Sequence, residues 1–129
     1  MVKKTITYTD YDGVERTEDF YFNLSKSELI KMEYGTEGGL TKILKKITDS
    51  KDTTEIMKYF DEILSKAYGE KSPDGKRFIK SKELYEAFAQ TNAYDILFME
   101  LFSDTDKMTS FIKGIVPDIP DTQNVLPMQ

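Results

Sequence analysis

The sequence predicts an α+β protein that is mainly α, with an N-terminal β-hairpin, five or six short helices and a flexible C-terminal tail. Three observations lead to this fold class. Residues 3–9 alternate polar and apolar side chains, which is the period of a half-buried strand. From residue 25 to 116, apolar side chains recur at intervals of three and four, as in amphipathic helices. Residues 117–129 contain three prolines among polar side chains, which disfavours regular structure.

The hairpin is expected within residues 1–22. The first run, residues 3–9, is rich in Thr, Ile and Tyr, and the second, residues 14–22, ends in three consecutive aromatic side chains. These residue types favour strands. The segment between the runs, Asp10-Tyr11-Asp12-Gly13, resembles the start of a calcium loop but lacks the later oxygen ligands, so it is interpreted as a turn.

The helical part is expected to begin at a capping box formed by Ser25 and Glu28. This first helix should end before the glycines at 35, 38 and 39, and a second should span residues 40–48. We interpret the glycine-rich segment between them as a connection, because it lacks the spacing of a phosphate-binding loop. The lysines at 42, 45, 46 and 51 are interpreted as a solvated helix face.

Three further signals place the later helices. A third helix should carry the apolar stripe Ile56, Phe60, Ile63, Leu64 and Ala67, with Gly69 as its C-terminal stop. After a turn at residues 71–76, residues 77–80 are read either as a short extended segment or as the lead into a helix capped by Ser81. An apolar helix should follow at 93–102. The last helix should start at Ser103-Asp104 and carry the apolar stripe Met108, Phe111, Ile112 and Ile115. The acids Asp104 and Asp106 suit a helix N-terminus better than a metal site.

Composition narrows the possible functions. The 129 residues include no His and no Cys, which excludes thiol chemistry, zinc sites of the usual ligands and nucleophiles activated by histidine. The net charge of −5 disfavours nonspecific nucleic-acid binding. No apolar run approaches a membrane span, and the N-terminus lacks the apolar core of a signal peptide. We therefore expect a cytoplasmic protein that is not an enzyme and uses no cofactor, metal, nucleic acid or membrane.

The remaining candidate for function is the apolar segment near the C-terminus. Eight of the eleven residues from Asn92 to Phe102 are apolar, so a helix there has no fully polar face. One interpretation is the central helix of an ordinary core. The other is a docking surface for another protein, because exposed apolar patches mark interfaces. The candidate protein-binding residues are Phe88, Tyr94, Phe98, Leu101 and Phe102.

Three ordered runs in this region carry a family resemblance: SPDGKRFIKS at 72–81, EAFAQTNAYDILFMEL at 86–101 and DTDKMTSFIKGIVP at 104–117. They cover about a third of the chain. In these runs the sequence resembles the small tail assembly chaperones of long-tailed, siphovirus-type bacteriophages that infect Gram-positive hosts.

The resemblance implies a non-enzymatic protein that binds and solubilises the tape measure protein and helps to recruit tail tube subunits. It implies a location in the host cytoplasm, absence from the mature virion and possible homo-oligomers. It also implies that a ribosomal frameshift can add a C-terminal domain, with residues 117–129 as the linker. Two alternatives stay open: a minor tail or connector protein that remains in the particle, and a small regulatory adaptor of the host.

Overall fold

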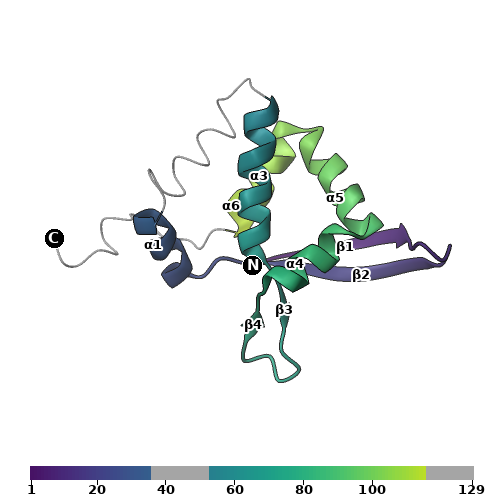
Figure 1. The fold of residues 1–129 in the computed structure, drawn as a ribbon, viewed down its shortest axis with the longest axis horizontal. Helices are drawn as coiled ribbons and strands as arrows, with labels where there is room; N and C mark the ends of the chain where they lie inside the picture. The colour runs from purple at the N-terminus through teal and green to yellow at the C-terminus, as the bar shows by residue number, and fades with distance from the viewer. Residues whose placement is uncertain (36–52, 116–129) are drawn as a thin grey trace.

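The computed structural model describes residues 1–35 and 53–115 (Figure 1). These residues form an α+β fold, as the sequence predicts. The strands are β1 (Val2–Thr9), β2 (Glu15–Phe22), β3 (Tyr68–Lys71) and β4 (Phe78–Ile79). The helices are α1 (Lys26–Gly35), α3 (Thr53–Ala67), α4 (Lys82–Ala89), α5 (Asn92–Phe102) and α6 (Thr105–Ile115).

Several sequence predictions lie outside the described residues. They are the helix at 40–48, the glycines at 38 and 39, the lysines at 42, 45, 46 and 51, and the tail at 117–129.

The predicted N-terminal hairpin is confirmed. β1 and β2 are antiparallel, in a register that pairs Val2 with Phe22 and Thr9 with Glu15. The turn is held by the Asp10 carboxylate, which accepts hydrogen bonds from the backbone N–H groups of Asp12 and Val14 at 2.9 Å each. Gly13 has a φ of 82°, a conformation that favours glycine. Local turn chemistry therefore accounts for the residues that resemble a calcium loop.

The sheet is larger than the sequence predicts, because α3 leads directly into a second hairpin. The strand order is β1-β2-β3-β4. Gly69 does not stop α3, which ends at Ala67; it lies inside β3. A Cβ atom at this position would lie 2.6 Å from the Phe78 ring and 2.8 Å from the carbonyl oxygen of Ile79. The glycine is thus required by the close approach of β4, and residues 78–79 are extended.

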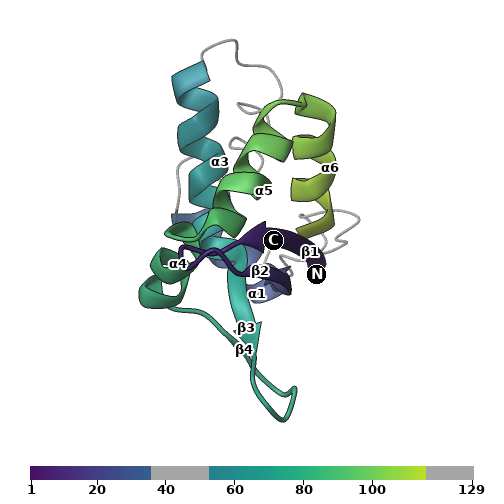
Figure 2. The ribbon, with the colours of Figure 1, turned by 90° about the vertical axis from the view of Figure 1, so that its right-hand side faces the viewer.

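The helices cover one face of the β1–β2 hairpin. Figure 2 shows α3, α5 and α6 on the same side of it. Ile6 and Tyr8 of β1 point into this layer and are buried, whereas the alternating residues of β1 are exposed. The predicted stripes of α3 and α6 supply much of the core: Phe60, Ile63, Leu64, Ala67, Met108, Phe111, Ile112 and Ile115 are all buried.

The predicted helix starts are also confirmed. The hydroxyl of Ser25 accepts from the N–H of Glu28 at 3.2 Å, and the Glu28 carboxylate accepts from the N–H of Ser25 at 2.8 Å. This reciprocal pair is a capping box. Ser81 caps α4 with a single bond, its hydroxyl accepting from the N–H of Leu84. Asp104 accepts from the backbone N–H of Asp106 at the start of α6.

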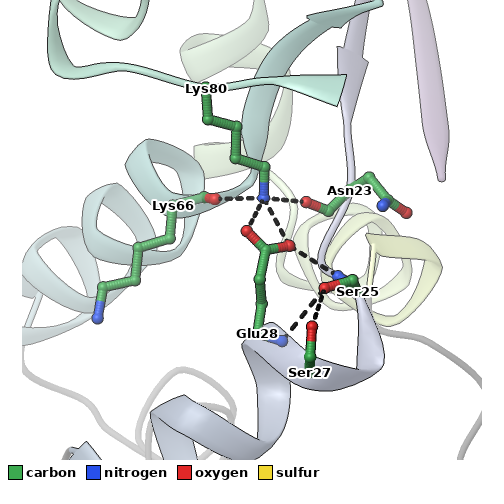
Figure 3. A network of polar contacts seen from close by, with 6 residues as sticks. All are labelled: Asn23, Ser25, Ser27, Glu28, Lys66 and Lys80. Carbon is green, nitrogen blue, oxygen red and sulfur yellow. Dashed lines mark hydrogen bonds and ion pairs between the residues drawn. The ribbon is translucent and has the colours of Figure 1, made fainter. Parts of the chain in front are cut away.

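A half-buried lysine joins elements that are distant in sequence (Figure 3). The ammonium group of Lys80, just after β4, donates to the carbonyl oxygens of Asn23 at 2.6 Å and Lys66 at 2.9 Å. It also contacts both carboxylate oxygens of Glu28, at 2.8 and 2.9 Å. Lys66 lies in the last turn of α3, so its carbonyl oxygen has no partner within the helix. The ammonium group of Lys80 donates to this oxygen instead. This network fixes α1 and β4 against the end of α3.

Candidate protein-binding surface

Helix α5 has one side that belongs to the core. Ala93, Leu97 and Leu101 are 0, 1 and 2% exposed and follow one another at one-turn intervals. This side faces β1 and α6, the two elements with which α5 packs most extensively. Thr91 begins the helix by accepting a hydrogen bond from the N–H of Tyr94. The buried side therefore serves stability.

A row of aromatic rings runs along the next side of α5. Tyr94, Phe98 and Phe102 are spaced by one turn each, and all three are partly buried against the core. The Tyr94 and Phe98 ring centroids are 6.0 Å apart, and those of Phe98 and Phe102 are 5.1 Å apart and nearly parallel. Phe98 also packs edge-on against Phe60 of α3 at 6.1 Å. The row thus fills the space between α5 and α3 while its outer part meets solvent.

One end of the row is fixed by a polar cluster. The Asp61 carboxylate of α3 accepts a hydrogen bond from the Tyr85 hydroxyl of α4 at 2.6 Å and lies 3.4 Å from the Tyr94 hydroxyl of α5. Burial, followed by the hydrogen bond to Asp61, raises the pKa of Tyr85 far above its usual range. Burial also raises the pKa of Tyr94. Both tyrosines therefore stay neutral donors that link three helices.

The outward side of α5 is apolar as well. Met99 is 59% exposed and lies on the side of α5 opposite Leu97 and Leu101. Ile96 is 43% exposed and lies beside Met99, about 100° around the helix from Leu97. This confirms that α5 has no fully polar face. We call Ile96, Met99 and the aromatic row Tyr94–Phe98–Phe102 the α5 surface.

The flanks of the α5 surface add further contact groups. On the β1 side, Lys4 forms an ion pair with Glu100 at 2.6 Å. A groove of about 540 Å³ lies beside this pair and is lined by Val2, Lys4, Glu100, Leu101, Asp106, Lys107, Ser110 and Phe111. On α3, Met57 is 41% exposed and lies one turn before Asp61. Apolar side chains with a charged border are typical of protein interfaces.

The structure divides the five predicted binding residues into two groups. Phe88 and Leu101 are 3 and 2% exposed, so both are core side chains. Phe88 packs its ring on Phe20, Phe22, Tyr68 and Tyr94. The other three, Tyr94, Phe98 and Phe102, form the aromatic row. Binding of a partner by any of the five residues stays a prediction.

Ile96, Met99 and Met57 are not among the five predicted binding residues. For Met99 the sequence holds a signal, because position 99 falls opposite positions 97 and 101 on a helical wheel, and Ile96 lies beside it. For Met57 no such signal exists, because its exposure depends on how α3 packs.

Residues 1–35 and 53–115 contain no group of three or more His, Cys, Asp or Glu side chains that could hold a metal ion. No helix in these ranges has the length and apolarity needed to cross a membrane.

These features define a small α+β protein whose most apolar helix is only partly covered. Comparison with protein families gives a match over residues 1–124 to a family described as phage tail assembly chaperone. The chain therefore belongs to the phage tail assembly chaperone family, and its role is that of a chaperone in phage tail assembly. Neither the curated proteins nor the solved structures include a match.

Proposed function

We propose that this chain is a non-enzymatic chaperone that binds and solubilises the phage tape measure protein and helps to recruit tail tube subunits. In this proposal it acts in the host cytoplasm and is absent from the mature virion. Membership of the tail assembly chaperone family supports an interaction with phage tail proteins. The particular partners are the part that we propose.

The observation that carries the proposal is the exposure of Ile96 and Met99 on a helix whose opposite side is buried. Full burial of such a side chain is worth about 1.5–3 kcal/mol, and because Ile96 and Met99 are about half exposed, covering what remains would gain roughly half of that for each. A partner helix laid along α5 over Met99 would also cover Ile96 on one side and the rim of Phe102 on the other. Methionine adapts its shape to different neighbours, which suits binding to many sites along one client.

The test is co-expression of the chain with the tape measure protein, with the soluble fraction of the latter as the readout. The variant is Ile96→Ser combined with Met99→Ser, which changes only exposed side chains. The matched control is Tyr11→Ser, because Tyr11 is an exposed apolar residue in the hairpin turn and is not part of the α5 surface.

We expect the control to keep the tape measure protein soluble and the double variant to lose most of that effect. If the double variant kept the tape measure protein as soluble as the wild-type chain does, the α5 surface would not be the binding surface. A chain with no effect on the solubility of the tape measure protein would contradict the proposed client itself.

The two alternative functions make different predictions. A minor tail or connector protein would be found in purified virions, whereas a chaperone should be missing from them. A host regulatory adaptor would act without any tape measure protein. Family membership favours the chaperone over both.

A further inference from the structure

We propose that the turn between β3 and β4, residues 71–77, is a second protein-binding surface and that it binds an acidic segment of a partner protein. We call these residues the basic turn. They belong to the second hairpin and not to the α5 surface. The inference is therefore independent of the tape measure protein as the client of α5.

The basic turn projects from the rest of the described structure. Figures 1 and 2 both show the β3–β4 hairpin extending away from the helices, with the turn at its outer end. All of its residues except Ser72 are exposed. The turn therefore adds little to the core, and a partner can reach it without displacing another element.

Internal hydrogen bonds nevertheless hold the turn in shape. The Ser72 hydroxyl donates to the Asp74 carboxylate at 2.6 Å and accepts from the N–H of Arg77 at 3.0 Å. The same carboxylate oxygen accepts from the N–H of Lys76 at 3.0 Å. Gly75, with a φ of 75°, donates its N–H to the carbonyl oxygen of Ser72 at 2.8 Å. A turn that is already ordered loses little conformational entropy when a partner binds.

The base of the second hairpin is fixed to the body of the protein. β3 pairs with Tyr21 and Phe22 of β2, and the ammonium group of Lys71 lies 4.4 Å from the centroid of the Tyr21 ring. Lys80, just after β4, is held by the network of Figure 3. The basic turn thus has a fixed orientation relative to the rest of the described structure.

The charge of the turn is opposite to that of the chain. Lys71, Lys76 and Arg77 stand against the single acid Asp74, a net charge of +2, whereas the whole chain has a net charge of −5. Within residues 1–35 and 53–115, neither the Lys76 ammonium group nor the Arg77 guanidinium group has an ion-pair partner. These two cations are therefore available to a partner.

Free cations on an ordered surface favour a partner that carries carboxylates. The guanidinium group of an arginine matches a carboxylate through two parallel hydrogen bonds, and a lysine adds a point charge. Nonspecific nucleic-acid binding needs many phosphate contacts, and the acidic remainder of the chain repels a long phosphate backbone. A short protein segment with aspartates or glutamates fits the small size and the sign of the basic turn better.

The test is a titration of the isotope-labelled chain with poly-L-glutamate at low salt, followed through the backbone amide signals by NMR. The variant is Lys76→Gln combined with Arg77→Gln, which removes both free cations but keeps the backbone N–H groups that hold the turn. The matched control is Lys58→Gln combined with Lys107→Gln. It has the same net charge and changes exposed lysines of α3 and α6 instead.

We expect the amide signals of residues 75–77 to shift and to saturate in the wild-type chain and in the control. The Lys76→Gln, Arg77→Gln variant should bind about tenfold more weakly, because it loses two exposed charge contacts. Ser72→Ala keeps every charge but removes the hydroxyl that orders the turn, so it should weaken binding by a smaller factor.

A variant of the α5 surface separates this inference from the proposed function. Ile96→Ser combined with Met99→Ser should bind poly-L-glutamate as the wild-type chain does. Failure of the α5 surface to bind the tape measure protein would then leave the basic turn unaffected, and the reverse holds as well.

Three results would overturn the inference. They are a wild-type chain without saturable shifts at residues 75–77, a Lys76→Gln, Arg77→Gln variant that binds like the control, and tighter binding of a single-stranded oligothymidylate than of poly-L-glutamate, which would indicate a nucleic-acid partner. If a variant does not fold by circular dichroism, salt titration of the wild-type complex decides. Binding should weaken as salt rises, and binding that salt leaves unchanged refutes the charge contact.

The acids of the chain's own C-terminal segment are the competing occupant. The variant Asp118→Asn combined with Asp121→Asn removes them. Its amide signals at residues 75–77 should match those of wild type before poly-L-glutamate is added. A difference there would assign the basic turn to the chain itself and overturn the proposed partner.

Discussion

The two opposite sides of α5 both carry large apolar side chains, yet one side is buried and the other is exposed. Leu97 and Leu101 lie in the core at 1 and 2% exposure, whereas Met99 lies outside at 59%. The same eleven-residue helix therefore contributes both to folding and to the surface. The comparison teaches that apolar composition alone does not separate a core helix from a binding helix. The position of each residue around the helix does.

The largest effect on stability is expected when a side chain on the buried side of α5 is shortened. Leu97→Ala should destabilise the fold by about 2–5 kcal/mol, because it removes buried methyl groups and leaves a cavity between α5, β1 and α6. Urea denaturation followed by circular dichroism measures the change. A loss below about 0.5 kcal/mol would mean that this side is not packed as described.

A smaller and mixed effect is expected for the aromatic row between the two sides. Phe98→Ser should cost about 1–3 kcal/mol, less than a fully buried phenylalanine, since Phe98 is partly exposed but packs on Phe60. It should also weaken solubilisation of the tape measure protein under conditions where the variant is folded. If the variant unfolds outright, the row is purely core. If its stability matches wild type, the contact with Phe60 contributes nothing.

The structure also shows which features of the fold can be predicted from the sequence. The capping box at Ser25 and the apolar stripes of α3 and α6 follow from local spacing, so they could be predicted. The second hairpin could be predicted only in part. The turn at 71–76 and an extended segment at 77–80 were within reach of local sequence, but β3 was not, because a glycine such as Gly69 after a helix normally indicates a stop. Its actual role depends on Phe78, nine residues away, whose ring occupies the space of a Cβ atom. Non-local packing of this kind leaves no periodic trace.

The candidate site divides in the same way. The location of the candidate site on α5 follows from the apolar composition of that segment. The composition does not say which side of the helix the rest of the protein covers. The apolar character of Phe88 and Leu101 makes both residues candidates in the sequence, but packing on Phe22, Tyr68 and α6 buries them in the core. That assignment needs the tertiary arrangement.

A third, weaker effect on stability is expected at Glu28, whose carboxylate is partly buried in the Lys80 network. Burial alone would raise the pKa of Glu28, but hydrogen bonds from Lys80 and from the N–H of Ser25 outweigh it and hold that pKa below the usual 4.5. Because the folded-state pKa is depressed, the contribution is present above the unfolded-state value and is lost as pH falls through the folded-state value. Glu28→Gln keeps an oxygen for Ser25 but removes the charge that Lys80 meets.

We expect Glu28→Gln to be less stable than wild type by about 0.5–1 kcal/mol at neutral pH, a modest value because the pair is partly exposed. The gap between the two proteins should narrow as pH falls below 4.5. Urea denaturation across this pH range measures it. A gap that stays constant with pH would show that the charge on Glu28 contributes no stability.

The smallest effect on stability should come from the outward side of α5. Met99→Ser alters a side chain that is 59% exposed, so its unfolding free energy should stay within about 0.5 kcal/mol of wild type. Binding should nevertheless suffer more than it does in Leu97→Ala, once each variant is compared at the same folded fraction. Thermal denaturation together with titration of a tape measure fragment measures both quantities. A destabilisation above about 1 kcal/mol would mean that Met99 is packed in the folded chain, and the two sides of α5 would then both belong to the core. Unchanged stability with lost binding separates the two sides, because only a surface kept free for a partner gives that combination.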